Sequence, residues 1–370
     1  MLIRTFKQGD ARTAVWLILI ALLLWSDSFL FLGFTMPEME EFAPLYRILL
    51  LALPPLPLLN VLMGFALLLA QVFLINSICF KYNFLGKSSW LPGFFYLVIM
   101  SSHHEYLFLT SSIVANLFLL LAFERMLRVF DSKDPVAEIF NVGMLFSIAG
   151  LIQYSSFLFV LWFLLILILY VLPSARTIAA AVTGVSLPLM LLSVWHFLNY
   201  RLHEEAMLFV QRFQTGFLFD NGLSVFEVIL MFALAGLTLV AFVRLYYGRL
   251  AEKPIRVRNR ISSVVYFFVF SLIAVLFLQE DFEASHNLVA IPLSILIGIA
   301  FQSFRRVWVA ELITMLYLLV ILYGKYPEWC CLGVFQNTVI VLQAGLIFLT
   351  LPKKSITHEI WCRCFSGIQL

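Results

Sequence analysis

The sequence is organised as long apolar runs separated by short polar connections. A helix that spans a bilayer needs about 20 apolar residues, and runs near this length recur along the chain. The pattern predicts an all-α fold with about twelve transmembrane helices, in a range of roughly ten to thirteen. The expected segments are residues 13–34, 57–80, 89–101, 106–123, 138–152, 157–173, 177–197, 223–243, 261–278, 287–302, 307–323 and 332–351.

Two segments mix apolar and charged positions instead. One lies near residues 38–50 and leads into Pro54, Pro55 and Pro57, which interrupt a helix. The other lies near residues 203–216 and is rich in aromatic, basic and amide side chains. Because amphipathic helices lie along a membrane surface, we expect both segments to form surface helices on the outer side.

Composition excludes several classes of protein. Hydrophobic residues make up 63% of the chain and charged residues 12%, whereas soluble domains have about one half and one quarter. Disordered chains have the reverse balance. The net charge is only +3, and the basic residues are scattered, so a nucleic-acid partner is not expected. A polytopic helical membrane protein remains, with the lipid bilayer as its partner and residues 1–370 as a single domain.

The distribution of basic residues predicts the orientation. If the N-terminus is inside and the spans alternate, the outer side receives only Arg47, Arg201, Arg212 and Lys325 of the basic residues. Lys and Arg concentrate on the cytoplasmic side of membrane proteins. We therefore expect both termini in the cytoplasm and the chain in the bacterial inner membrane. An error of two spans would leave this skew intact, so a lower count stays open.

Two groups on the outer side are candidates for chemistry. Asp27, in LLLWSDSFLFLG, is flanked by apolar residues, where a carboxylate is costly unless it faces a polar cavity or a partner. The turn SSHHEYLF carries His103, His104 and Glu105, and these residue types bind divalent cations. The alternatives are an acid at the membrane interface for Asp27 and a solvated turn for the second group.

Three arginines on the outer side depart from the charge rule: Arg47, Arg201 and Arg212. Guanidinium groups bind phosphate through paired hydrogen bonds, so they are candidates for binding an anionic substrate. The alternative is pairing with nearby acids, namely Glu41, Glu204 or Glu205.

Two resemblances extend this interpretation. Residues 73–165 contain the asparagine-bearing helix end FLINSICFKYN, the LP dipeptide of SSWLPGFF, the helix ANLFLLLAFER and the following helix FNVGMLFSIAG. This stretch resembles an uncharacterised polytopic inner-membrane family of Bacteroidota. That resemblance implies a membrane location and carries no activity.

The second resemblance is architectural. An acid at the outer end of the first span, a surface helix before the second and a histidine-bearing second outer loop are similar to the C-type glycosyltransferases, which use polyprenyl-phosphate-linked sugars. The resemblance implies that Asp27 or Glu38 is the base and that His103, His104 and Glu105 bind a metal or the substrate. The sequence EMEE stands where that family has an Asp-Glu or Asp-x-Asp motif.

Other functions stay open beside the transferase. One is a non-catalytic subunit or assembly factor of a membrane complex, and another is a transporter, although charges within spans are scarce. No phosphate-binding loop and no HExxH motif is present. For a transferase we expect a lateral cavity on the outer side, lined by the segments after the first, third and seventh spans.

Overall fold

The computed structural model describes residues 2–7, 9, 11–30, 43–54, 56–86, 88–102, 108–170, 174–212, 225–247, 254–277, 282–304 and 307–325. The chain divides into two compact units, Met1–Gly324 and Lys325–Leu370. Residues 326–370 lie outside the described ranges, so the description concerns the first unit, and the expectation of a single domain stays a prediction.

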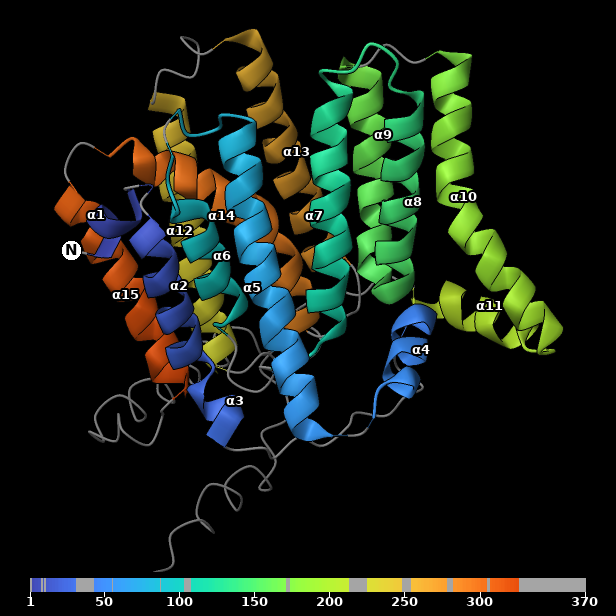
Figure 1. Cartoon of the computed structure of the whole chain (residues 1–370), viewed down its shortest axis with the longest axis horizontal. Helices are drawn as coiled ribbons and strands as arrows, with labels where there is room; N and C mark the ends of the chain where they lie inside the picture. Colours follow the sequence, from blue (N-terminus) through green and yellow to red (C-terminus); the bar gives the residue numbers. More distant parts are fainter. Residues whose placement is uncertain are drawn as a thin grey trace, which may run out of the picture. The chain divides into compact units, whose positions relative to one another are not determined.

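The described residues are helical, and no strand occurs among them. The predicted all-α class is therefore confirmed for this part of the chain. In chain order (Figure 1) the helices are α1 Leu2–Lys7, α2 Ala11–Leu24, α3 Ser26–Leu30, α4 Pro44–Ala52, α5 Pro57–Lys81, α6 Leu91–Met100, α7 Ser111–Val129, α8 Val136–Ile152, the 3-10 helix η2 Tyr154–Phe157, α9 Leu158–Tyr170, α10 Ala175–Leu198, α11 Leu202–Arg212, α12 Val225–Tyr247, α13 Ile255–Phe277, α14 Phe282–Gln302 and α15 Val307–Lys325.

Each segment predicted as a span up to residue 323 overlaps one of these helices, but the count of twelve spans is not supported. Three helices of the described residues are long and apolar enough to cross a membrane: α5, α10 and residues Ile255–Val275 of α13. Other apolar helices are shorter, and α6 has only 10 residues. At 1.5 Å per residue such a helix is about 15 Å long, half of a bilayer core.

Local sequence signals determine where several helices begin. At the start of α10, Ser174 Oγ accepts a hydrogen bond from the backbone N–H of Thr177 at 3.3 Å, and Thr177 Oγ1 accepts one from the N–H of Ser174 at 2.8 Å. This reciprocal pair satisfies two donors that a helix leaves free. Thr110 caps α7 through its side chain, and α5 begins at Pro57, whose missing N–H is not needed there.

The centre of the unit is formed by α6 and α14. All residues of α6 are buried, as are residues 286–301 of α14. The two helices approach closely because Gly298 faces Pro92, and a Cβ at Gly298 would lie 2.8 Å from Pro92 Cγ. On the other side of α6, a Cβ at Gly93 would overlap Asn76, whose Oδ1 accepts a hydrogen bond from the Gly93 N–H at 2.9 Å. Small residues thus allow α6 to be enclosed by its neighbours.

Helix α10 packs against α8 over its first half only. Small residues line this contact, and a Cβ at Gly184 would overlap the carbonyl oxygen of Phe140 in α8. Pro188 follows four residues later inside the helix. Proline lacks the N–H that would bond to residue 184 and clashes with that carbonyl, so the helix bends. Figure 1 shows the bend, after which α10 leaves α8 and α11 returns beside it.

One end of the unit carries a group of ion pairs. Helices α5 and α7 end there, and α8, α10 and α13 begin (Figure 1). Glu124 binds two cations, because its Oε1 lies 2.8 Å from Lys81 Nζ and 2.9 Å from Arg128 Nη2. Arg125 pairs with Glu138 and Arg260 with Asp131. We call this the basic end, defined by Lys81, Arg125, Arg128 and Arg260.

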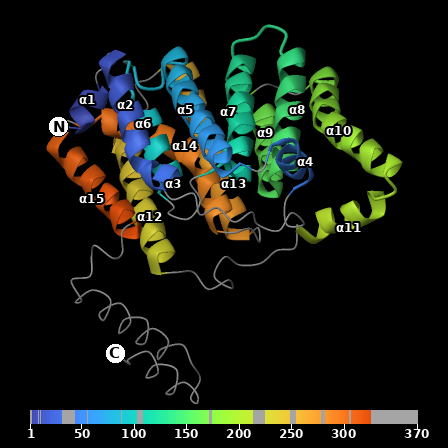
Figure 2. The same ribbon diagram turned by 60° about the horizontal axis from the view of Figure 1, so that its bottom comes forward.

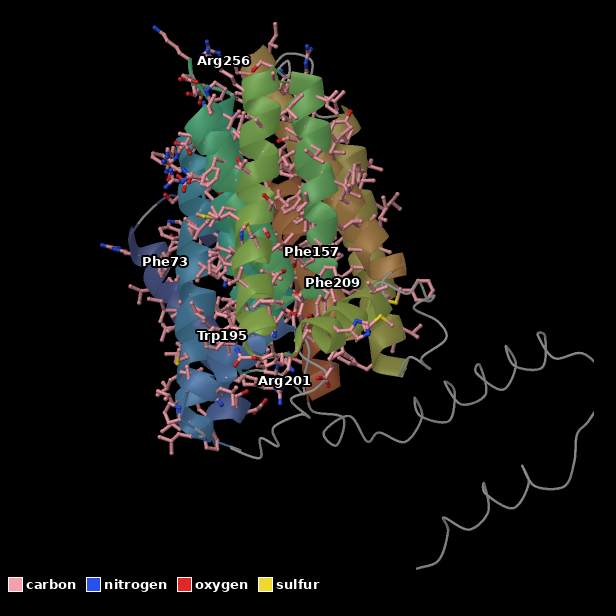
Figure 3. All side chains as sticks on the ribbon, turned by 90° about the vertical axis from the view of Figure 1, so that its right-hand side faces the viewer. Phe73, Phe157, Trp195, Arg201, Phe209 and Arg256 are labelled. Atoms are coloured by element: carbon pink, nitrogen blue, oxygen red, sulfur yellow. The ribbon has the colours of Figure 1, made fainter. Side chains whose placement is uncertain are left out.

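The other end is the one where α6, α8 and α10 finish, and we call it the opposite end. It carries Asp27, Arg47, Arg201 and Glu205. Figure 3 shows Arg256 and Arg201 at the two different ends. Helices α4 and α11 lie at the opposite end (Figure 1 and Figure 2) and overlap the segments predicted as surface helices. Residues 38–42 and 213–216 lie outside the described ranges.

Candidate functional site

Asp27 lies on α3, at a corner that is tied to the end of α6. The chain turns at Trp25, between α2 and α3. The Trp25 side chain is fully buried, and its indole N–H donates a hydrogen bond to Ser101 Oγ at 3.1 Å. Ser101 directly follows α6, so the corner that carries Asp27 lies beside the point where the chain enters residues 103–107. Residues 31–42, which include the start of the segment after the first predicted span, lie outside the described ranges.

The predicted metal ligands cannot be placed within the described ranges. Residues 103–107 lie outside them, as does Glu38, the second candidate for the base. Among the residues that the structure describes, no three His, Cys, Asp or Glu side chains are grouped closely enough to hold a metal ion. The divalent cation and its ligands His103, His104 and Glu105 stay a prediction.

Helix α4 links the outer segments to one another. The Tyr46 hydroxyl donates a hydrogen bond to the carbonyl of Leu109 at 2.6 Å, which ties α4 to the start of α7. Arg47 Nη2 lies 2.8 Å from each carboxylate oxygen of Glu205 on α11. Both side chains are largely covered, with 22% and 13% of their surfaces exposed. Pairing with an acid was the alternative to phosphate binding at Arg47, and Glu205 is that acid.

The other two arginines lie at the two ends of α11. Arg201 is exposed in the turn between α10 and α11, after Tyr200, which has a left-handed backbone with φ of 58°. The Arg201 N–H donates to the carbonyl of His196 at 3.0 Å, so the turn closes the end of α10. Arg212 ends α11, and its side chain lies outside the described residues. The structure thus pairs Arg47 with an acid and leaves Arg201 exposed. Phosphate binding by Arg201 and Arg212 stays a prediction.

A pocket of about 260 Å³ opens where α10 has left α8. Its walls come from α4, α8, η2, α10 and α11, and they are mostly apolar. Phe209 of α11 closes one side, with its ring edge-on to Tyr154 and Phe157 at centroid distances of 5.7 and 5.5 Å (Figure 3). The polar groups are few, as is typical of binding sites for apolar ligands, and they include His196 and the carboxylate of Glu205.

His196 lines this pocket and carries a nitrogen without a partner among the described residues. Its Nε2 is buried and makes no hydrogen bond to the part of the chain that the structure describes. A buried polar nitrogen normally finds a partner, so this atom is suited to contact a ligand. The expected cavity was to be lined by the segments after the first, third and seventh spans. Pro44 and α11 belong to the first and seventh, whereas residues 103–107 of the third are not described.

Sequence reasoning missed a group of buried uncharged polar residues beside α6. Tyr96 donates a hydrogen bond to Gln71 Oε1 at 2.5 Å, and Gln71 Nε2 donates to the carbonyl of Ile113 at 2.6 Å. Asn116 Nδ2 reaches the carbonyl of Asn287 at 3.0 Å. The sequence signal for these residues was an amide side chain inside an apolar run. Such a side chain is tolerated within a membrane when it forms a hydrogen bond to a neighbouring helix. These bonds connect α5, α6, α7 and α14.

Comparison with known proteins adds no family to this description. No protein-family model matches the chain, and no curated protein matches it. The resemblances to the Bacteroidota family and to the C-type glycosyltransferases stay predictions.

Proposed function

We propose that this chain is a multi-pass membrane protein of the bacterial inner membrane, and that the shorter apolar helices are embedded in the bilayer beside the three long ones. Large apolar side chains on these helices support this, since Leu23 of α2, Ile168 of α9 and Phe232 of α12 are 64%, 62% and 75% exposed. Such surfaces are unusual on a soluble monomer. The short helix α6 is enclosed by protein, which is where a helix that cannot cross the bilayer is tolerated.

The basic end faces the cytoplasm in this proposal. Lys81, Arg125, Arg128 and Arg260 gather there, and basic residues accumulate on the cytoplasmic side of inner-membrane proteins. The opposite end, with Asp27 and the α10–α11 pocket, then faces the periplasm.

The proposed activity is transfer of a sugar from a polyprenyl-phosphate-linked donor at the opposite end. The hydrogen bond between Trp25 and Ser101 carries this proposal, because it brings the helix of Asp27 beside the point where the chain enters residues 103–107. In the reaction, the acceptor oxygen forms a bond to the anomeric carbon while the bond to the phosphate oxygen breaks. Asp27 takes the acceptor proton, and the polyprenyl phosphate leaves with the bonding electron pair.

The experiment is a transfer assay with the full chain in lipid nanodiscs and a labelled polyprenyl-phosphate sugar. Asp27→Asn keeps the size of the side chain and removes its charge, so it should lower the rate by about a hundredfold or more. The matched control is Asp134→Asn, the same change at an exposed position at the basic end, which should leave the rate unchanged. Full activity of the Asp27→Asn protein would exclude the proposed base.

A second candidate is a non-catalytic subunit of a membrane complex. The observation in its favour is that the described candidate residues occupy separate elements: Arg47 is already bound by Glu205, Arg201 is exposed, and Asp27 lies on α3 beside α2 and α5. The transfer assay and a complementation test in a deletion strain together separate the two proposals. If the wild-type protein shows no turnover and the Asp27→Asn protein supports growth of a deletion strain normally, the subunit is the better description.

A further inference from the structure

The pocket between α10 and α11 has a lining suited to a hydrocarbon chain. Its volume of about 260 Å³ is slightly below the usual range of small-molecule sites, roughly 300–1,000 Å³. Leu189 and Leu192 of α10 face Leu202 and Phe209 of α11 across it. The walls are mostly apolar, and the carboxylate of Glu205 is already paired with Arg47. The pocket therefore favours an apolar occupant, because burying an unpaired charged group there would cost free energy.

The surface of α10 next to the pocket is also apolar. Met190, Leu191, Phe197 and Leu198 are each about two thirds exposed, at 66%, 65%, 66% and 67%. In a membrane this part of α10 would be covered by lipid chains, since contiguous exposed apolar surface marks contact with a membrane or a partner. A chain in the pocket would therefore come from the same bilayer that covers the helix.

A polar group for the headgroup lies at the rim. A second hollow, of about 640 Å³, is lined by Tyr200, Leu202 and His203, and Ala206 lines both hollows, so the two adjoin. Arg201 stands between Tyr200 and Leu202 in the chain and is exposed. A guanidinium group binds phosphate well, and a phosphate is the group that follows the apolar chain in a membrane lipid.

We infer that the α10–α11 pocket binds one acyl chain of an anionic phospholipid from the surrounding bilayer, with Nε2 of His196 near the ester region and Arg201 at the phosphate. The bend at Pro188 makes the site, because it separates the second half of α10 from α8. This inference rests on the membrane location in the proposed function and is independent of the transfer reaction.

The test uses the full chain in nanodiscs of phosphatidylethanolamine that contain phosphatidylglycerol with a photoactivatable acyl chain. After irradiation, mass spectrometry of peptides should find the label on α10 and α11. Leu192→Gln puts an unpaired amide into the apolar pocket and should lower this labelling on the order of tenfold. The matched control, Leu187→Gln, makes the same change on α10 at a residue outside the pocket lining and should leave labelling unchanged.

Two further variants test the pocket and the headgroup site separately. Ala206→Phe fills the pocket and replaces Leu192→Gln if that protein does not elute as a single species. Arg201→Gln should reduce labelling by phosphatidylglycerol relative to a photoactivatable phosphatidylethanolamine. Equal labelling in the pocket variants and the control would overturn the inference, as would label spread evenly along α10. A chain that does not enter nanodiscs at all would instead overturn the proposed membrane location.

Discussion

Arg47 of α4 and Glu205 of α11 join two helices at the opposite end of the unit. The pair is two-pronged, at 2.8 Å for both oxygens, and largely covered. A covered charge that loses its partner is costly, because neither water nor protein then compensates it. At the level of single residues, the pair therefore holds α11 in the position that closes the pocket.

Glu205→Gln should destabilise the protein for this reason. Arg47 would keep its charge without a carboxylate partner. We expect the free energy of unfolding to fall by about 1–3 kcal/mol, a loss between those typical of exposed and of fully buried ion pairs. The measurement is thermal unfolding in detergent micelles. Glu204→Gln, at the adjacent exposed position, is the control and should have little effect. The double variant Arg47→Gln with Glu205→Gln should recover part of the loss, and an equal loss from the Glu204 and Glu205 variants would contradict this role.

Glu124 at the basic end predicts a dependence of stability on pH. Glu124 directly follows the predicted span 106–123 and therefore lies outside it. Burial by itself would raise the pKa of Glu124, but hydrogen bonds from Lys81 and Arg128 outweigh burial and hold the pKa below its usual value. A lowered folded pKa means that the stabilisation is present above the unfolded value, about 4.3, and is lost as the pH falls through the folded value.

The wild-type thermal midpoint should therefore fall as the pH drops below about 4.3, and Glu124→Gln should make this part of the profile flatter. The readout is the unfolding midpoint across acidic pH in one detergent, with Glu204→Gln as the control. Parallel profiles for the wild type and Glu124→Gln would show that the ion pairs of Glu124 contribute no pH dependence.

At the level of elements, close approach of helices depends on glycine at defined positions. Gly184 of α10 faces the backbone of Phe140 in α8, whereas Gly236 of α12 has open space around it. The contact at Gly184 lies one turn before Pro188. It therefore anchors the first half of α10 while the second half departs, and the pocket exists because these two features are adjacent.

The two glycines form a matched pair of tests. Gly184→Ala should force α8 and α10 apart and lower the free energy of unfolding by about 1–3 kcal/mol. Gly236→Ala meets no atom and removes the entropic cost of a helical glycine, so it should be neutral or up to about 1 kcal/mol more stable. Thermal unfolding in detergent gives both values. A loss of stability in Gly236→Ala as large as that in Gly184→Ala would refute the packing argument.

The positions of the helices were predictable from the sequence. The partner of Arg47 and the number of helices long enough to cross a membrane were not. Apolar runs place the helices up to residue 323, because burial favours helices wherever a run is long enough. The same runs overestimated the spans, since α6 becomes a 10-residue helix enclosed by protein. Three acids were possible partners for Arg47, and only the fold selects Glu205. Pro188 indicates a bend, but the path of α10 beyond it depends on α11 and α4.

At the level of the whole unit, the helices from α5 to α10 alternate in direction between the basic end and the opposite end (Figure 1). Consecutive connections therefore lie at different ends: the one after α7 at the basic end, the one after α8 at the opposite end, and the one after α9 at the basic end again. If the unit sits in a bilayer, the location of any one connection determines the others. The proposed orientation places the end with the ion pairs of Lys81, Arg125 and Arg260 in the cytoplasm.

Reporter fusions at described connections test this arrangement directly. Fusions after Ser132 and Ser174, at the basic end, should give a fluorescent protein that folds in the cytoplasm and an inactive alkaline phosphatase. Fusions after Gln153 and His203, at the opposite end, should give active phosphatase, because that enzyme forms its disulfides only outside the cytoplasm. Each site is its own control, since both reporters are read at the same position. If Ser132 and Gln153 report the same side, α8 does not cross the bilayer and the multi-pass arrangement is wrong. If all four sites are reversed together, the helices cross as proposed and the charge rule assigns the wrong side.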